Sequence, residues 1–398
     1  MIPRGTLDID WGSLFAGTLR SFSSLDVNQG CDSIERHWDA EHPVIVCQSV
    51  RSGLDLVLKS VDWPRGSEIL MSAVTIPQMA AIVIARGFVP VPVDVHPKSL
   101  APVVEQLQSR ITSHTRAILV AHLFGSRLDL RQIAVLARQH GLELWEDVAQ
   151  GFAGDGFPGD VNADISFFSF GMIKAQTAIG GAVLRFQDRN LAEQVRALHT
   201  GWREQSTGAF RRKLCRALLL QLLSSHAVFT TVAEAARFAR LDLDTWLSQS
   251  TRGFKQSEFF EQLRKRPCGA LVDLLNRRLL RQDRRWMDQK ARLAEDYCRL
   301  LSPHVLLGVD ANFPSRWVLP VVSHNPQELQ SRLMKSGFDA TRRASQLQVI
   351  SVAVNHPEWT TPMSQSWVPQ LVYLPLHPAL RMPHIQAIAS MVNKLEER

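Results

Sequence analysis

A regular alternation of short apolar runs and helical segments between residues 68 and 145 constrains the fold more than any other feature of the sequence. The apolar runs are about five residues long and the helical stretches about ten to twelve, which is typical of βαβ units. Such units have right-handed crossovers, so they build a parallel or mostly parallel sheet that helices cover on both faces. The expected strands are Glu68–Val74, Val89–Val95, Ala117–Ala121 and Leu142–Trp145, separated by helices Pro77–Arg86, Leu100–Arg110 and Asp129–His140.

Further strand and helix signals on either side of this block give an α/β fold class. Val44–Cys47 reads as a strand before a helical pattern at Leu54–Leu58, and Ile165–Phe170 and Gly181–Arg185 read as later strands. A short helix is expected around Cys31–Asp39.

After residue 185 the pattern changes, and three parts of the chain are expected. Residues 1–200 form a lead-in and a large α/β domain, residues 201–265 an inserted basic helical segment, and residues 266–398 a linking helix and a small α+β domain. The expected elements are helix Asn190–Leu198, the helical stretch Thr200–Gln256, one long helix Ala270–Leu300, strand Trp317–Val322, helix Pro326–Ser336, a strand near Leu371–Leu374 and a closing helix Pro383–Leu395.

Composition favours a cytoplasmic protein. The sequence has no apolar run near the ~20 residues that span a bilayer, and its first residues lack the layout of a signal peptide. Five scattered cysteines without a CxxC pair argue against a disulfide framework or a zinc ribbon and for a reducing compartment.

The chain is basic, with a net charge of +7 and a pI near 9.4. Its arginines concentrate in Arg203–Arg216 and Arg264–Arg285 without a zinc-finger, homeodomain-like or RNP pattern. We therefore prefer solvated helical faces and a few phosphate-binding arginines to nucleic-acid binding. The apolar stretch Leu214–Leu223 favours a buried or interface helix, and peripheral membrane contact is the less favoured alternative.

An acid and an amine follow two of the expected strands, at the edge where open α/β sheets bind ligands. Asp147 comes after the strand that ends at Trp145, and Lys174 lies in a loop of Ser, Phe and Gly residues after Phe170. A lysine can form a Schiff base if burial or nearby positive charge lowers its pKa, whereas a lone loop lysine is more often a surface residue. A carboxylate at a strand end suits the protonated ring nitrogen of a pyridine cofactor.

Other polar residues are expected near the same edge. Gln150 follows Asp147 by three residues, and Ser169 precedes Lys174 by five, where its hydroxyl would suit a phosphate. Arg51 and Ser52, with Ser49, lie between a short strand and a helix start, where N–H groups and helix polarity favour an anion.

These motifs together resemble the DegT/StrS-type family of sugar aminotransferases, pyridoxal-phosphate enzymes of the aspartate-aminotransferase fold, fold type I. The matching text is "EILMSAVTIPQMAAIVIARGFVPVPVDV", "RAILVAHLFGSRLDLRQIAVLARQHGLELWEDVAQ", "DISFFSFGMIKAQTAIGGAV" and "LPLHP". The resemblance is continuous over roughly Val44–Thr200 and returns in Arg266–Leu301 and the C-terminal lobe. It implies a large domain with a mostly parallel sheet of the seven-stranded type between helices, a smaller C-terminal α+β domain, and a homodimer with active sites at its interface.

The resemblance also implies residue roles. Lys174 matches the lysine that forms the internal aldimine and moves the proton, and Asp147 matches the carboxylate on the pyridinium nitrogen. Gln150 matches the glutamine near the ring, Ser169 a phosphate-binding serine, and Ser52 a further phosphate contact.

The chain departs from the family at several positions. The usual Gly-Thr ahead of Ser52 is Val50-Arg51, and Arg51 is expected to replace the lost hydroxyl by charge. The ring-stacking aromatic residue aligns with Ile76, and Arg264 stands where an asparagine usually precedes Arg266. The segment Gln205–Gln256 is much longer than the family's usual connection.

The expected function is transamination with pyridoxal 5'-phosphate (PLP), through a Lys174 aldimine. An amino donor, expected from the resemblance to be glutamate or glutamine, would aminate a keto group on a sugar nucleotide or similar anionic acceptor. Two alternatives stay open: dehydratase-like PLP chemistry, against which Lys174 counts, and a degenerate scaffold that binds a ligand or partner protein. No metal is expected, because the Asp155, Asp160 and Asp164 group has glycines that suit turns. His122 either lines the site or packs beside Phe124 for structural reasons.

Overall fold

A seven-stranded sheet forms the centre of the larger lobe in the computed structural model, which describes residues 1–239, 241–250, 258–281, 283–344, 346–351 and 355–397. The strand order is β1-β8-β7-β6-β5-β2-β4. β4, β2, β5, β6 and β7 run parallel, while β8 pairs antiparallel with β7 and β1. The predicted α/β class with a mostly parallel seven-stranded sheet is confirmed. The strands are β1 (Val44–Cys47), β2 (Glu68–Ser72), β4 (Val89–Val93), β5 (Thr115–Ala121), β6 (Glu143–Asp147), β7 (Ile165–Ser169) and β8 (Ala182–Phe186).

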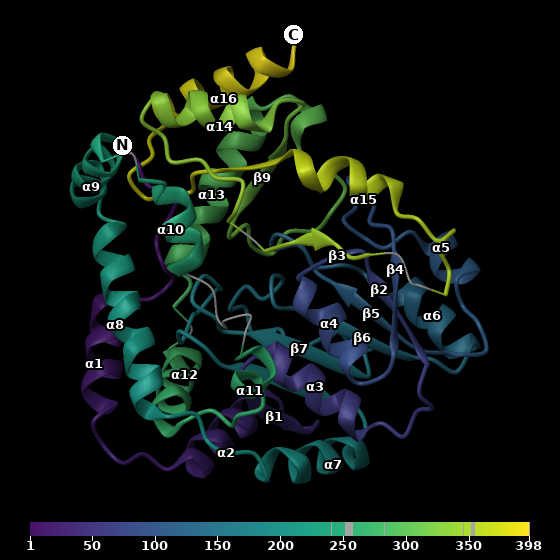
Figure 1. Ribbon diagram of the computed structural model, residues 1–398. Helices are drawn as coiled ribbons and strands as arrows, with labels where there is room; N and C mark the ends of the chain where they lie inside the picture. Colours follow the sequence, from purple (N-terminus) through teal and green to yellow (C-terminus); the bar gives the residue numbers. More distant parts are fainter. Residues whose placement is uncertain (240, 251–257, 282, 345, 352–354, 398) are drawn as a thin grey trace.

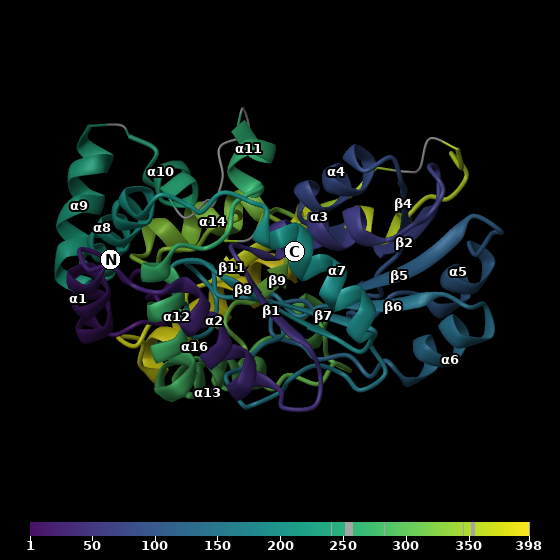
Figure 2. The same ribbon diagram turned by 90° about the horizontal axis from the view of Figure 1, so that it is seen from below.

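Helices cover both faces of this sheet because successive side chains of a strand point to opposite faces and the strands carry buried apolar side chains on both. Ile69 and Met71 of β2 belong to the core under α3, α4 and α7, whereas Leu70 between them belongs to the core under α5 and α6. Figure 2 shows these two helix layers on either side of the strands. The helices are α3 (Val50–Ser60), α4 (Pro77–Ala85), α5 (Val104–Ser109), α6 (Arg131–Gln139) and α7 (Arg189–Thr200).

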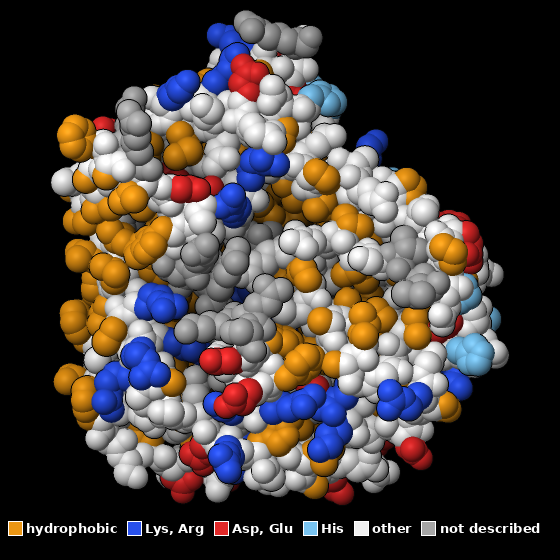
Figure 3. All heavy atoms as spheres, viewed as in Figure 1, with side chains coloured by type: hydrophobic (Ala, Val, Ile, Leu, Met, Phe, Trp, Pro, Cys, Tyr) orange, Lys and Arg blue, Asp and Glu red, His pale blue; other side chains and the backbone are white. Residues whose placement is uncertain are grey.

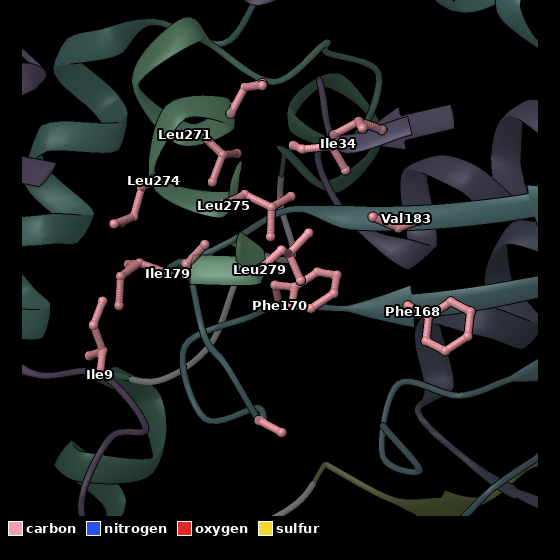
Figure 4. Close-up of a cluster of buried hydrophobic side chains, with 14 of the residues drawn as sticks. Ile9, Ile34, Phe168, Phe170, Ile179, Val183, Leu271, Leu274, Leu275 and Leu279 are labelled. Atoms are coloured by element: carbon pink, nitrogen blue, oxygen red, sulfur yellow. The ribbon is translucent and has the colours of Figure 1, made fainter. Parts of the chain in front are cut away.

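At the β1 end of the sheet, the second face packs on α12 (Gly269–Arg281) and α2 (Val27–Trp38). Phe170 lies close to Leu275 and Leu279 of α12, whereas Phe168 lies further along β7 in the same core (Figure 4). α1 (Trp11–Arg20) lies against both α8 (Thr207–Leu223) and α12. This core therefore anchors the start of the loop that carries Lys174.

Two of the predicted helices differ from the structure. The expected Ala270–Leu300 helix is two helices, α12 and α13 (Arg285–Leu300). The change of direction separates two cores, because Leu275 packs under the large sheet whereas Tyr297 packs in the C-terminal lobe. The expected Leu100–Arg110 helix starts only at Val104, because Leu100 has a φ of 59° and Pro102 disfavours a helical Ala101.

The C-terminal lobe has its own core and a two-stranded antiparallel sheet, β9 (Leu319–Val322) with β11 (Leu371–Leu374). Around it lie α13, α14 (Pro326–Lys335) and α16 (Met382–Glu396), while α15 (Pro362–Trp367) reaches back to the large lobe. A second link is the pairing of β10 (Gln348–Val349) with β3 (Val74–Thr75).

The basic helical stretch contains α8 (Thr207–Leu223), α9 (His226–Phe238), α10 (Leu243–Ser250) and α11 (Phe259–Leu263); its residues 251–257 lie outside the described part. Apolar side chains gather along the edge formed by α1, α8 and α9 (Figure 3), among them the exposed Phe15, Leu19, Leu219 and Leu222. Within the described residues, no single helix has the length and apolarity needed to cross a membrane; α8 and α9 pass that test only as a pair bent by 93°.

Candidate active site

The carboxyl ends of β1, β6 and β7 bring most of the predicted site residues to one edge of the sheet. Asp147 is the last residue of β6, and its backbone pairs with Phe167 of β7, the strand that ends at Ser169. Arg51 lies in the first turn of α3, directly after β1. This is the edge where parallel α/β sheets hold ligands.

The Lys174 loop connects β7 to β8 in a strained but well-anchored conformation. Gln176 and Ile179 have φ values of 48° and 63°, a left-handed region that side chains other than glycine seldom adopt. Asp8, which is 3% exposed, compensates by accepting a hydrogen bond from the Gln176 N–H at 2.6 Å. The Phe170 carbonyl accepts from the N–H groups of Ala178 and Gly180. The loop position of Lys174 is thus set by the sequence-distant N-terminal segment.

The Lys174 amine lies 4.5 Å from the centre of the Trp317 ring, a cation–π distance. Burial lowers the pKa of Lys174 to about 8. Among the charges, Asp147 opposes this shift and Arg51 adds to it. About a tenth of the amine is therefore neutral at pH 7, and this is the form that attacks a carbonyl carbon.

Asp147 is half-buried, and two opposing effects act on the pKa of its carboxyl group. Burial raises the pKa of Asp147, while a hydrogen bond from the Ala149 N–H at 2.9 Å and the charge of Lys174 lower it. The net direction is upward. A buried carboxylate of this kind gains from a cationic partner, because the ionised form is otherwise poorly solvated.

Gln150 and Ser169 are both half-buried near this edge. The Gln150 Oε1 accepts from the backbone N–H of Phe124 at 3.2 Å, which fixes the turn after β5. The Ser169 hydroxyl accepts only a long contact, 3.4 Å, from the Gly171 N–H. Both side chains keep further hydrogen-bonding capacity.

Ser52 is placed differently from the other predicted site residues. It is fully buried, and its hydroxyl donates to the Leu263 carbonyl of α11 at 2.8 Å while lying 2.9 Å from the Ser49 hydroxyl. Ser49 caps α3 by accepting from the Ser52 N–H. In this arrangement, the Ser52 hydroxyl ties α3 to α11.

Arg51 is joined by a second cation that sequence analysis did not identify. Burial lowers the pKa of Arg51 to about 10. Burial also lowers the pKa of Lys213 in α8 to about 8, and the charge of Arg51 contributes to that shift. Two buried cations, one of which lowers the pKa of the other, mark a place where an anion would be favoured.

His122 is structural. Its Nε2 lies 2.8 Å from Glu146 Oε2, its Nδ1 accepts from the Leu128 N–H, and both side chains are buried. Burial would raise the pKa of Glu146, but hydrogen bonds from His122, Ser166 and the Asp160 N–H hold it below its ordinary value.

The three aspartates of the neighbouring loop have separate partners. Asp155 pairs with Arg127, Asp160 accepts from Asn162, and Asp164 accepts from the Leu144 N–H. No group of three His, Cys, Asp or Glu side chains suited to a metal occurs within the described residues.

The other departures noted in the sequence serve packing. Ile76 lies at the start of α4 and packs partly buried in the core of the α3, α4 and α7 face. Arg264 pairs with the buried Asp55 at 3.0 Å, and Arg86 pairs with the same carboxylate.

Sequence reasoning missed Trp317, Lys213 and Asp8. Each belongs to a segment outside the βαβ block, and only tertiary packing brings it to the Lys174 edge. Weak signals were present: Trp317 stands just before a strand, and Lys213 lies among the clustered basic residues.

Comparison with solved structures defines the class of fold. A DegT DnrJ EryC1 StrS aminotransferase from Brucella abortus matches with a TM-score of 0.69 at 19% identity, covering 97% of this chain and 96% of that one. A sugar aminotransferase from Micromonospora echinospora matches with a TM-score of 0.70 at 17% identity, covering 99% and 100%. The chain has the large-lobe and small-lobe α/β fold of these aminotransferases.

Sequence comparison then indicates a family. The model of the DegT/DnrJ/EryC1/StrS aminotransferase family matches residues 32–220, so this part of the chain is similar to that family. The UDP-N-acetyl-3-dehydro-alpha-D-glucosamine 3-aminotransferase of Acidithiobacillus ferrooxidans is 32% identical over 161 residues, 39% of this chain and 44% of that protein. The L-glutamine:2-deoxy-scyllo-inosose aminotransferase of Streptomyces fradiae is 31% identical over 189 residues, 45% of each. The chain thus aligns with less than half the length of these curated relatives.

Proposed function

We propose that this chain is a PLP-dependent aminotransferase that moves an amino group from an amino acid, glutamate or glutamine, to a keto group on a sugar nucleotide or related anionic acceptor. The carrying observation is a lysine amine of lowered pKa beside a strand-end carboxylate at the ligand-binding edge of the sheet. The match of residues 32–220 to the family model supports the same function, as do the two relatives, whose names describe them as aminotransferases.

The residues at this edge fit pyridoxal phosphate. Asp147 offers its carboxylate to the pyridine nitrogen, Lys174 offers a partly neutral amine, and Gln150 lies three residues from Asp147. Arg51 and Ser169 would hold the phosphate, with Lys213 as an added cation. Ser52 would support the start of α3 through its bond to Leu263, and would contact phosphate only if that bond were exchanged. When bound, the pyridine ring supplies an electron sink for the carbanion that deprotonation of an amino acid creates.

The chain's own groups divide the work of the reaction. The Lys174 amine would bind the carbonyl carbon of the cofactor covalently. It would later accept and return the substrate's proton at Nζ, a role for which a pKa of about 8 is well matched. Asp147 stabilises positive charge at the ring nitrogen. Trp317 covers the amine and limits access of water. Arg51 and Lys213 attract anionic substrates and the phosphate. We also propose a homodimer as the working assembly.

One observation favours a second candidate, a non-catalytic binding scaffold. The Ser52 hydroxyl, expected to contact phosphate, is fully buried and already bonded within the chain. If the remaining cations do not compensate, the protein would bind a ligand without turning it over. Dehydratase-like PLP chemistry has no comparable support, because Lys174 is in place.

The visible absorption spectrum of the purified chain with added pyridoxal phosphate tests the proposal. We expect a band that Lys174→Ala lacks and that glutamate or glutamine bleaches. Borohydride reduction followed by peptide mass analysis should place the cofactor on Lys174. A band that no amino donor bleaches would contradict transamination, and no band at all would support the scaffold.

A further inference from the structure

A mostly apolar cavity of about 160 Å³ lies next to the Lys174 loop. Ile173, the residue before Lys174, forms part of its wall, and so does Trp317, whose ring lies 4.5 Å from the Lys174 amine. Leu220 and Leu223 of α8, Phe229 of α9 and Leu247 of α10 line another side. The basic helical segment therefore completes a compartment against the candidate active site.

The charged groups in the cavity wall are already paired within the chain. Arg4 contacts Asp339 at 2.8 Å and Asp244 at 2.7 Å, and Arg343 donates to Thr245. Lys290 donates to the Thr6 carbonyl, and burial lowers its pKa. A ligand with a bare charge would have to break these pairs. The cavity therefore favours an uncharged group.

Within the described residues, the cavity wall has buried polar atoms without a hydrogen-bond partner at Thr6 Oγ1 and Trp317 Nε1. The indole Nε1 of Trp317 is buried and, within the described residues, has no hydrogen-bond partner; Trp317 itself is 6% exposed. A buried donor left unpaired costs stability, so a ligand acceptor atom reaching it would gain affinity. The cavity wall thus combines an apolar volume with an unpaired indole N–H, on a ring whose centre lies 4.5 Å from the Lys174 amine.

We propose that this cavity receives an uncharged apolar group, about the size of a six-membered carbon ring, on the molecule that reacts at Lys174. The size follows from the volume, because a buried apolar cavity of about 150 Å³ accommodates benzene. The inference rests on the proposed function, since it names a substrate feature of that same site. The cavity would restrict the amino acceptor to molecules that carry a carbocycle or a short apolar substituent on the side of the carbonyl that faces α8.

α8 provides a matched pair of variants. Leu220 is 7% exposed and lines the cavity, whereas its neighbour Leu219 is 45% exposed on the outer side of the same helix. Leu220→Trp would fill the cavity, and Leu219→Trp makes the same chemical change outside it. Both substitutions leave the net charge unchanged, and the two positions are adjacent in α8.

The first experiment measures benzene binding to the full chain by titration calorimetry. Wild type and Leu219→Trp should bind it saturably and equally, and Leu220→Trp should bind at least about 10-fold more weakly. Because overpacking can unfold a protein, Leu220→Ala serves as a second variant and should enlarge the cavity and shift preference from benzene toward naphthalene. Absence of saturable binding by wild type, or equal loss in both tryptophan variants, would overturn the proposal.

The second experiment asks whether the cavity serves Lys174. Without cofactor, acetone or cyclohexanone condenses with the neutral Lys174 amine, losing one water, and borohydride adds hydride to the resulting C=N bond to leave a stable secondary amine. Peptide mass analysis then quantifies the modified Lys174. We expect cyclohexanone to be captured at least about 10-fold more efficiently than acetone, a preference that Leu220→Trp loses and Leu219→Trp keeps.

These readouts separate the cavity from the proposed function. Benzene binding should survive Lys174→Ala, whereas the pyridoxal-phosphate band should not. Benzene binding without a ketone preference would refute the link to Lys174 and so the proposal. A normal cofactor band without benzene binding would refute the cavity and leave transamination standing.

Discussion

The protonation state of Lys174 is the residue-scale property on which the candidate chemistry depends. Burial lowers its pKa to about 8, and two charges act in opposite directions: Asp147 raises it and Arg51 lowers it. The pKa of Lys174 can therefore be changed in either direction by substituting Asp147 or Arg51, with the lysine itself left intact. The folded state releases the proton earlier than the unfolded chain, so this group adds stability as pH rises between about 8 and 10.5.

Covalent capture of pyridoxal phosphate should follow this titration. We expect its initial rate to rise through an apparent pKa of about 8 and then level off, because only the neutral amine attacks. Asp147→Asn should move the apparent pKa down and Arg51→Gln should move it up, each by less than about 2 units. Stopped-flow absorbance across pH measures both shifts. Shifts in the same direction would contradict the assigned charges, and Lys174→Ala is the blank.

At the scale of elements, the turn after β5 determines where Trp317 lies. Gly125 has a φ of 100°, and a Cβ there would meet the Ser315 carbonyl oxygen at 2.1 Å. In the same turn the Arg127 N–H donates to the Asn312 carbonyl at 2.8 Å. The large lobe and the segment leading to Trp317 thus approach backbone to backbone, which only glycine permits.

Gly125→Ala should therefore do more than strain one residue. We expect a loss of about 2–4 kcal/mol in unfolding free energy, from the left-handed backbone and the displaced 315–317 segment together. Gly141→Ala is the control, because Gly141 has a φ of 65° but nothing lies within 4 Å of an added Cβ; it should lose only about 1–2 kcal/mol. Denaturant unfolding measures both. Displacing Trp317 should also change the pH at which Lys174 captures cofactor, which Gly141→Ala should not.

The sequence predicted those elements whose cause is local. Strand and helix periods located the βαβ block, and the position of Asp147 and Lys174 after strands was enough to place both at one sheet edge. The break between α12 and α13 was missed because the two halves of one continuous helical pattern pack into two separate cores. The roles of Trp317, Lys213 and Asp8 arise from packing between segments that lie far apart in the sequence. The spacing of residues along the chain carries no signal for such contacts, so these three residues were missed.

At the scale of the whole molecule, the N-terminal segment joins the two lobes. Ile2 pairs its backbone with Phe338 of the C-terminal lobe, and Ile9 lies in the core beneath the large sheet. Between them, Asp8 holds the Lys174 loop through Gln176. The segment therefore ties the position of Lys174 to the small lobe. A substitution where this segment contacts the C-terminal lobe should therefore alter the position of Lys174.

Arg4 is the contact that tests this coupling. It bridges Asp339, whose side chain is 3% exposed, and Asp244 of α10. Arg4→Ala would leave a buried carboxylate without its partner, so we expect a loss of about 3–5 kcal/mol in unfolding free energy. Arg131→Ala, which removes an 80% exposed arginine paired with Asp129, should have no measurable effect. Because Arg4 also lines the cavity, folded Arg4→Ala protein should show a changed ratio of cyclohexanone to acetone capture at Lys174. A full loss of stability with an unchanged ratio would show that the segment stabilises the lobes without positioning the site.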